Sequence, residues 1–389
     1  MISTIRLAYI SPLRYPSERA GSLFSVKSCE AFARVGVETE LWIPWRYNPD
    51  FHTDVFTHYG VERTFKVRKF FAIDLTQYGT WAYPLLYITF ALSVFTHVLF
   101  KKKDIILYSH EQFALFLLTF ISRKTFYEVH DFPGDQKLYQ ILFKRLTGVV
   151  TTNSWKGREL PKRFHISPDK VLVVPNAVSP EDFSINLSKE ESREKLGLDK
   201  ETYIIGYVGG LKTMGMEKGV ATAIDSLAYL PDTYKLYVVG GEAPQDIQYY
   251  RDYATEKKLV DRVIFVGPVA HADVPTHIAA CDVLVAPFPA NEHYSHYMSP
   301  MKVFEYMASH RPIVVTDLPT LTEVLTDGET ALIVPPSDAQ ALAQAIQKLV
   351  QDPALAEKLA DAAYTEVTGK YTWSKRAERI LSFLSQKIG

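Results

Sequence analysis

Short apolar segments that alternate with helical patterns constrain the fold of this chain more than any other feature. The first is Ile5–Ile10, and it is followed by a polar loop and a helical pattern over Leu23–Arg34. A second apolar segment comes directly after, at Val37–Ile43. Strand, loop, helix and strand in this order open a doubly wound α/β domain. The pattern starts again at Tyr203–Val208, so we expect two such domains.

The other apolar segments also have the length of buried strands. They are Asp104–Tyr108, Thr125–His130, Gly148–Thr152, Val171–Val174, Lys235–Val239, Val263–Val266, Val283–Ala286, Ile313–Thr316 and Ala331–Val334. With 389 residues, 47% of them hydrophobic, the chain can bury two large cores. We place the first domain at residues 1–178, the second at residues 179–370, and a separate helical tail at residues 371–389.

Charge is distributed unevenly between the two halves. The first 180 residues hold 23 Lys and Arg against 15 Asp and Glu, and the rest of the chain is acidic. A basic first half suits an anionic membrane surface or a phosphorylated acceptor, although a solvated surface without a partner explains it equally well.

Two cysteines, Cys29 and Cys281, lie far apart and show no metal-ligand spacing, which argues against a disulfide framework or a metal site. The first ten residues resemble a buried strand rather than a signal sequence. We therefore expect a cytoplasmic protein.

The segment Trp81–Phe100 contains no Asp, Glu, Lys or Arg, and three lysines follow it. Its length and hydropathy would allow it to span a bilayer. Pro84 near its start and the strand pattern that follows favour a buried helix of the first domain. A helix that rests on the membrane, with its lysines at the headgroups, and a true span are the alternatives.

A carboxylate interrupts the apolar face of a helix in the second half. Ser299 and Pro300 suit an N-cap and a first helical residue, and Pro312 ends the pattern. Glu305 stands on the same face as the apolar stripe, which consists of Met301, Phe304 and Ala308. An unpaired carboxylate there would be costly to bury.

Two interpretations of Glu305 remain open. It pairs with a Lys, an Arg or a backbone N–H of a neighbouring element, or it accepts hydrogen bonds from a ribose diol. In the second case a diphosphate would lie over the free N–H groups near Ser299, Met301 and Lys302, where the helix dipole favours anions.

Two consecutive predicted strands of the first half end in histidines, His110 and His130. Because ligands of open parallel sheets bind outside the carboxyl ends of strands, these imidazoles are candidate site residues. A structural role is the competing interpretation for each.

Two loops carry candidate phosphate contacts. In the first half, Gly21 would let the backbone approach a ligand and Ser22 could cap the following helix. In the second half, Lys218 stands at a loop-to-helix junction and could neutralise a diphosphate. The pattern around Lys218 is neither G-x-G-x-x-G nor a Walker sequence, which argues against nicotinamide binding and ATP hydrolysis.

Taken together, the motifs of the second half resemble those of the GT-B glycosyltransferases, in particular glycosyltransferase family 4. They are Val-Pro-Asn-Ala-Val-Ser-Pro-Glu-Asp-Phe at 174–183, Val-Gly-Gly at 208–210 and 239–241, Glu-Lys-Gly at 217–219, Phe-Val-Gly-Pro-Val at 265–269, Cys-Asp-Val-Leu-Val-Ala-Pro at 281–287, and the helix that contains Glu305. The resemblance implies two Rossmann-like domains facing across a cleft, with the C-terminal helix crossing back to the first domain.

The resemblance also implies transfer of a sugar from a nucleotide diphosphate donor with retention of configuration, without a metal and without another cofactor. By position, Glu305 would hold the ribose, Lys218 the diphosphate, and backbone groups near Val269 the base. Gly21 would approach the phosphates from the first domain. His110 would contact the donor sugar and steady the developing charge, with His130 as the second candidate for that role.

Two positions depart from the family pattern. The family usually has a second Glu eight residues before Glu305, where this chain has Tyr297, and often an Arg where this chain has Gly210. We infer that diphosphate binding relies more on Lys218, helped by Lys212 or Lys302. His293 and His296 are candidates for the missing sugar contact.

The expected function is therefore a hexosyltransferase that acts on a glycan, lipid-linked or small-molecule acceptor in cell-envelope or exopolysaccharide synthesis. It would be cytoplasmic, with peripheral membrane contact through the basic first domain and no nucleic-acid partner. A catalytically weak nucleotide-sugar-binding subunit and a nucleotide-sugar epimerase are the alternatives. The sequence does not identify the sugar, the base or the linkage.

Overall fold

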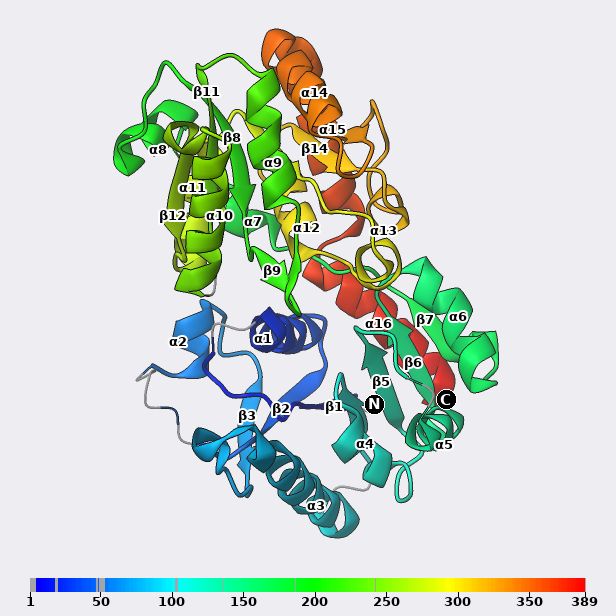
Figure 1. The fold of residues 1–389 in the computed structure, drawn as a ribbon. Coiled ribbons are helices and arrows are strands. Elements are labelled where there is room, and N and C mark those ends of the chain that lie inside the picture. Colours follow the sequence, from blue (N-terminus) through cyan, green and yellow to red (C-terminus); the bar gives the residue numbers. More distant parts are fainter. Residues whose placement is uncertain are drawn as a thin grey trace. The chain divides into compact units, whose positions relative to one another are not determined.

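The computed structural model describes residues 5–17, 20–46, 48, 53–101, 104–134, 136–185, 187–241 and 243–388 (Figure 1). The chain forms two compact units: unit 1 contains residues 1–175 and 373–389, and unit 2 contains residues 176–372. Each unit has its own parallel sheet flanked by helices, so the predicted α/β class is confirmed.

Unit 1 is built on a seven-stranded parallel sheet with the order β3-β2-β1-β4-β5-β6-β7. The strands are β1 (Arg6–Ile10), β2 (Glu38–Pro44), β3 (Lys66–Phe70), β4 (Ile106–Ser109), β5 (Thr125–Val129), β6 (Gly148–Thr151) and β7 (Val171–Val173). Leu7 of β1 pairs with Thr39 on one side and with Ile106 on the other, so the direction of strand addition reverses between β1 and β4. Open parallel sheets bind ligands at such a switch point.

The helices of unit 1 cover both faces of this sheet (Figure 1). They are α1 (Ala20–Arg34), α2 (Val55–Tyr59), α3 (Tyr83–Lys101), α4 (Gln112–Leu118), α5 (Lys137–Arg145), α6 (Ser154–Phe164) and α16 (Trp373–Ile388). Helix α16 packs against α1, where the rings of Phe24 and Trp373 lie 5.3 Å apart. The predicted return of the C-terminal helix to the first half of the chain is therefore confirmed.

Unit 2 contains a six-stranded parallel sheet with the order β12-β11-β8-β13-β14-β15. The strands are β8 (Tyr203–Val208), β11 (Tyr234–Val239), β12 (Val263–Gly267), β13 (Val283–Ala286), β14 (Ile313–Thr316) and β15 (Leu332–Val334), and β9 (Lys212–Thr213) with β10 (Met216–Glu217) forms a small antiparallel pair. Strand β8 has β11 on one side and β13 on the other, so the switch point of this sheet lies at the end of β8.

The helices of unit 2 follow its strands along the chain. They are α7 (Pro180–Phe183), α8 (Lys189–Leu196), α9 (Val220–Ser226), α10 (Pro244–Glu256), α11 (Val274–Ala279), α12 (Met301–Met307), α13 (Pro319–Thr322), α14 (Ala339–Gln351) and α15 (Pro353–Lys370). Local sequence explains several boundaries: Ser188 forms a capping box with Glu191 at the start of α8, and the Asp338 side chain caps α14.

Helix α3 differs from the expectation of a buried helix. Thr80–Phe100 is the single stretch of the described residues that is helical, long and apolar enough to cross a membrane, yet only 28% of it is buried. Phe90 and Val94 pack into the core of unit 1, whereas Ile88 and Leu92 on the opposite face are exposed. The prediction was therefore wrong for one face of the helix.

Candidate functional site

The carboxyl end of β8 leads into the turn Gly209-Gly210, and Lys218 lies beside this turn. A Cβ atom at Gly210 would stand 3.4 Å from Lys218 Nζ. The next residue, Gly219, has a φ of 91°, and a Cβ there would lie 1.8 Å from the carbonyl oxygen of Pro287. Only glycine fits in this position, so the close approach to the end of β13 fixes the backbone at Lys218.

Lys302, in the first turn of α12, is buried and directs its ammonium group to the same turn. A Cβ at Gly209 would lie 3.2 Å from Lys302 Nζ, and Nζ is 3.7 Å from the centroid of the Tyr207 ring. Within the described part of the chain Nζ makes no hydrogen bond. The aromatic ring attracts the cation but leaves its three N–H donors unused.

The pKa of Lys302 reflects this environment. Burial lowers it well below 10.5, Lys218 lowers it further, and Glu305 opposes the shift. Two lysines that face one glycine turn repel each other, so an anion between them would be stabilised by both.

Glu305 follows Lys302 by one turn of α12 and is partly exposed. Its carboxylate makes no hydrogen bond and no ion pair with any other described residue. Burial raises the pKa of Glu305, while His271 and then Lys302 oppose that rise. The protein partner that one interpretation of the sequence required is therefore not found among the described residues.

Val269 lies in the loop after β12 and packs against the core of unit 2. A short 3-10 helix, His271–Asp273, follows this loop, and its His271 opposes the rise in the pKa of Glu305. Sequence reasoning missed His271, because a single histidine after a strand is not unusual.

The start of α12 corrects one expectation. The helix begins at Met301 with Pro300 as N-cap, and no side chain caps it. The Ser299 hydroxyl instead accepts a hydrogen bond from the backbone N–H of Asn176 at 3.1 Å, and the Ser299 carbonyl accepts one from the Asn176 side chain. Ser299 is thus held by the segment after β7, and the predicted N-cap role was wrong.

Tyr297, one of the two positions that depart from the family pattern, has a hydrogen-bond partner nearby. The Tyr297 hydroxyl donates to the carboxylate of Glu292. His293 and His296 lie in the same short π-helical turn, His293–Tyr297. Lys212 is paired with Asp246 at 2.8 Å, so of the two lysines considered as helpers of Lys218, only Lys302 has its donors unused.

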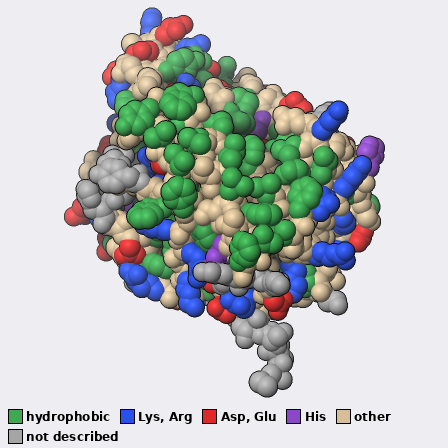
Figure 2. Space-filling model, turned by 90° about the horizontal axis from the view of Figure 1, so that it is seen from below, with side chains coloured by type: hydrophobic (Ala, Val, Ile, Leu, Met, Phe, Trp, Pro, Cys, Tyr) green, Lys and Arg blue, Asp and Glu red, His purple; other side chains and the backbone are tan. Residues whose placement is uncertain are grey.

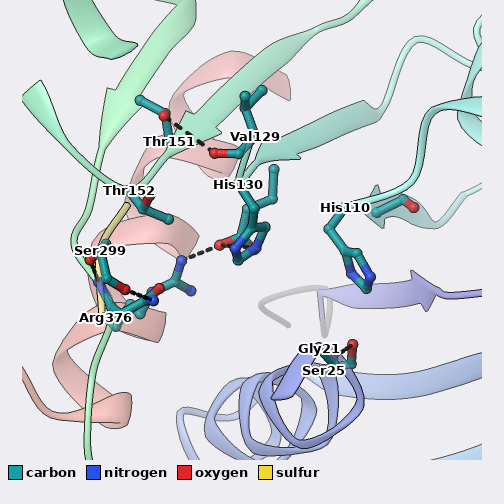
Figure 3. Close-up of polar contacts among 12 residues, drawn as sticks. Gly21, Ser25, His110, Val129, His130, Thr151, Thr152, Ser299 and Arg376 are labelled. Carbon is teal, nitrogen blue, oxygen red and sulfur yellow. Dashed lines mark hydrogen bonds and ion pairs between the residues drawn. The ribbon is translucent and has the colours of Figure 1, made fainter. Parts of the chain in front are cut away.

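In unit 1, His110 and His130 follow neighbouring strands and lie close together (Figure 3). Their ring centroids are 5.9 Å apart. His110 Nδ1 is 3.0 Å from the Tyr9 hydroxyl, and the His130 ring packs edge-on against Phe24 of α1 at 4.5 Å. Burial lowers the pKa of His110 to about 3, with a further contribution from His130, so His110 is neutral at physiological pH.

A buried ion pair supports His130. Glu128, on β5, is fully buried and accepts hydrogen bonds from Arg376 of α16 and from the Tyr108 hydroxyl, the latter at 2.7 Å. His130 Nε2 lies 3.4 Å from the same carboxylate. Burial alone would raise the pKa of Glu128, but Arg376, His130 and Tyr108 hold it well below its usual value. Sequence reasoning missed this cluster.

The predicted loop at Gly21 and Ser22 was also wrong. Both residues belong to the first turn of α1, which begins at Ala20. Ser22 is fully buried and its hydroxyl donates to the carbonyl of Arg14 at 3.2 Å, so it does not cap the helix. The Gly21 carbonyl accepts a hydrogen bond from the Ser25 hydroxyl (Figure 3).

Comparison with known proteins agrees with this geometry. Residues 202–352, all in unit 2, match the family model of glycosyl transferases group 1. The chain is 29% identical over 247 residues to the D-inositol 3-phosphate glycosyltransferase of Stackebrandtia nassauensis. The aligned region covers 62% of this chain and 54% of that protein. The chain spans about half the length of curated relatives such as this one and the alpha-D-kanosaminyltransferase of Streptomyces kanamyceticus.

Solved structures match almost the entire chain. Sucrose-phosphate synthase from Thermosynechococcus elongatus has a TM-score of 0.79 at 20% identity, with 98% of both chains covered. HepE from Anabaena, solved in complex with UDP, has a TM-score of 0.74 at 17% identity, with 98% of this chain and 100% of that chain covered. The predicted GT-B fold is thereby confirmed. Assignment to glycosyltransferase family 4 stays a prediction.

Proposed function

We propose that this protein is a retaining glycosyltransferase that moves a sugar from a nucleotide diphosphate donor to a glycan or lipid-linked acceptor, in cell-envelope or exopolysaccharide synthesis. One observation carries the proposal. Lys302 and Glu305, one turn apart on α12, both lack a hydrogen-bond partner within the described residues. A buried cation such as Lys302 is nearly always paired in folded proteins, and the carboxylate of the partly exposed Glu305 is free to accept hydrogen bonds. This combination supports a ligand that has both an anionic group and hydrogen-bond donors. A nucleoside diphosphate has both.

The phosphate end of the ligand would be bound by Lys218 and Lys302. Both ammonium groups face the turn Gly209-Gly210 at the end of β8, where a parallel sheet of this order binds ligands. Lys302 would thus supply the positive charge that the family often takes from an Arg at the position of Gly210. The backbone near Ser299 and Met301 remains a proposed phosphate contact.

The nucleoside end would be bound by Glu305 and the loop that contains Val269. A partly exposed carboxylate without a protein partner can accept two hydrogen bonds from a ribose diol. His271, which follows Val269 by two residues and opposes the rise in the pKa of Glu305, supports a base site near this loop.

For the transfer step, we propose His110 first and His130 second. Burial keeps the Tyr9 hydroxyl protonated, so it can donate to His110 Nδ1 and leave the Nε2 proton available to a sugar hydroxyl. A neutral imidazole suits this role, because it adds no positive charge beside a developing oxocarbenium ion. Gly21 remains a proposed backbone contact of the phosphates. As the family resemblance implies, the proposed reaction uses no metal.

We place the protein in the cytoplasm, peripherally on the cytoplasmic face of the membrane. The basic first 180 residues support this location, since anionic headgroups attract Lys and Arg. A lipid-linked acceptor would be available at the same surface.

Calorimetric titration can test the two ends of the ligand separately. We expect one of UDP, GDP, ADP or dTDP to bind, and inorganic pyrophosphate to bind more weakly. Lys302→Met should lower the affinity for both ligands by roughly 10- to 100-fold, the scale of a hydrogen bond to a charged group, whereas Glu305→Gln should affect the nucleotide alone. Lys348→Met, an exposed lysine of α14, is the control.

Unchanged nucleotide affinity in both Lys302→Met and Glu305→Gln would contradict the proposal. Turnover is checked with the nucleotide sugar that binds best. Sugar transfer or slow donor hydrolysis that disappears in Glu305→Ala supports an enzyme, whereas binding without turnover across acceptors supports a partner subunit. Incorporation of solvent deuterium without an acceptor would indicate an epimerase.

A further inference from the structure

One face of unit 1 is unusually apolar. Ten of the large apolar side chains that are exposed in the described residues lie between positions 71 and 120. They are Phe71, Ile73, Tyr78, Trp81, Ile88, Leu92, Leu99, Phe100, Phe113 and Phe120, which we call the apolar face. Figure 2 shows a broad hydrophobic area seen from below, with Lys and Arg side chains at its edge. Such extended apolar patches mark interaction surfaces.

Helix α3 forms the centre of the apolar face. Its inner side, with Phe90 and Val94, belongs to the core of unit 1. The outer side of an ordinary surface helix carries charges, but no Asp, Glu, Lys or Arg occurs between Trp81 and Phe100. The outer side of α3 therefore resembles a core surface that the fold of unit 1 leaves exposed.

The neighbouring segments extend this surface on both sides of α3. The backbone N–H of Ile73 donates to the Thr89 hydroxyl at 3.0 Å, which joins the segment before the helix to α3. The rings of Tyr87 and Phe113 stack with centroids 5.8 Å apart, which joins α4 to α3. The exposed apolar residues are thus parts of one continuous face.

Basic side chains border the apolar face. Arg68 and Lys69 are exposed at the end of β3, where Arg68 lies 3.3 Å from His97 of α3. Arg123 is exposed after α4, and the exposed Arg145 lies over the Phe120 ring at 4.1 Å. Acidic residues near this border are paired: Asp104 with Lys124, Glu40 with Arg68 and Asp74 with Arg46.

We propose that the apolar face docks unit 1 onto an anionic lipid surface, with α3 lying in the plane of the interface. A basic border around an apolar centre matches the headgroup and acyl layers of such a membrane, and Tyr78 and Trp81 are of the types that favour that boundary. A second copy of the chain fits less well, because two such faces in contact would bring their basic borders together. A membrane span is incompatible with the inner side of α3, which forms part of the core.

Docking would also serve the proposed transfer. Helix α4, which contributes Phe113 to the apolar face, has Glu111 as its N-cap, and Glu111 follows His110 directly. The apolar face thus continues toward the strand end that carries the candidate histidines. This link to a lipid acceptor rests on the proposed function, whereas docking itself does not.

Co-sedimentation with vesicles tests the proposal on the full chain. We expect binding to phosphatidylcholine vesicles that contain phosphatidylglycerol, little binding to phosphatidylcholine alone, and weaker binding at high salt. The double variant Ile88→Gln/Leu92→Gln should lower the partition coefficient by on the order of 10-fold or more, because two apolar side chains no longer enter the interface. Tyr229→Gln, which changes an exposed aromatic residue of unit 2, should bind as the wild type does.

Nucleotide binding by the same variants separates this proposal from the proposed function. The double variant should keep the wild-type nucleotide affinity, which also shows that it is folded. The docking proposal is overturned if the wild type ignores anionic vesicles, if the double variant binds them equally well, or if the protein resists alkaline carbonate extraction as a spanning protein would. A dimer that the double substitution dissociates, without any vesicle binding, would assign the face to a second copy.

Discussion

The two units bury charged side chains near the carboxyl ends of their strands in opposite ways. In unit 1, Glu128 is fully buried and its carboxylate is satisfied by Arg376 and Tyr108. In unit 2, the buried Lys302 has no such partner among the described residues, and neither has the partly exposed Glu305 one turn later. A satisfied buried charge contributes to one folded arrangement, whereas an unsatisfied one lowers stability and is retained where a ligand completes it. Whether a charged side chain has a protein partner thus distinguishes a structural cluster from a binding site.

The largest effect is expected from breaking the satisfied pair. Arg376→Met leaves the Glu128 carboxylate buried without its cation and should lower the free energy of unfolding of unit 1 by about 3–5 kcal/mol. All five tryptophans of the chain belong to unit 1, so tryptophan fluorescence during urea unfolding reports on this unit alone. Lys387→Met on the same helix removes an exposed pair with Asp169 and should leave the midpoint unchanged. If Arg376→Met and Lys387→Met unfold at the same urea concentration, the buried pair does not stabilise unit 1, and the two units do not differ in the way described.

A large loss of turnover is expected at Lys218. Lys218→Ala should reduce turnover by ~10²-fold or more, the scale for losing one preorganised electrostatic contact, because the departing diphosphate loses a cation. Circular dichroism of the variant in the absence of nucleotide checks that it is folded. Near-wild-type turnover would refute the role of Lys218.

Replacing Lys302 should raise the stability of unit 2, whereas replacing Arg376 should lower the stability of unit 1. Lys302→Met replaces a buried cation that has no hydrogen bond by an apolar side chain of similar length, so unit 2 should gain about 1–2 kcal/mol of stability. Urea unfolding followed by circular dichroism, with the unit 1 transition assigned from tryptophan fluorescence, measures this change. A loss of stability would show that Lys302 stabilises the fold, as Arg376 does.

The smallest effect is expected from pH. The folded-state pKa of Lys302 lies below its unfolded value, so the unfolded state binds more protons between the two and unit 2 should become more stable as pH rises through that window. The folded-state pKa of Glu128 lies below its unfolded value of about 4.3, so its contribution to unit 1 is present above that pH and is lost as pH falls below it. One proton changes the free energy of unfolding by at most about 1.4 kcal/mol per pH unit.

Urea unfolding across pH, read separately for each unit, measures both slopes. The rise in the stability of unit 2 should be absent in Lys302→Met. If it persists there, another group causes it.

The sequence predicted the fold well where strands are buried on both faces. Internal strands such as β8 and β13 are apolar runs without a charged residue, as is typical of a parallel sheet. The edge strand β3 was missed because Lys66-Val-Arg-Lys-Phe70 alternates charged and apolar residues and is largely exposed. Composition likewise could not show that α3 would have one buried and one exposed face.

Candidate residues could be predicted where a local pattern is broken. Glu305 interrupts an apolar stripe and Lys218 stands at a loop-to-helix junction, so both are visible in the sequence. Glu128 lies in an apolar strand and Arg376 in an amphipathic helix, 248 residues apart, and nothing local connects them. The unused donors of Lys302 could be recognised only from the structure, since they depend on every neighbouring atom.

Helix α16 gives unit 1 an unusual order of assembly during synthesis. The ribosome makes residues 1–175, then the whole of unit 2, and only then the helix that carries Arg376. Until Arg376 is made, the nascent first unit contains Glu128 without the cation that pairs with it, whereas every strand of unit 2 precedes α16 in the chain. Unit 2 can therefore complete its fold first, although unit 1 is made earlier and waits for the helix that brings Arg376 to Glu128.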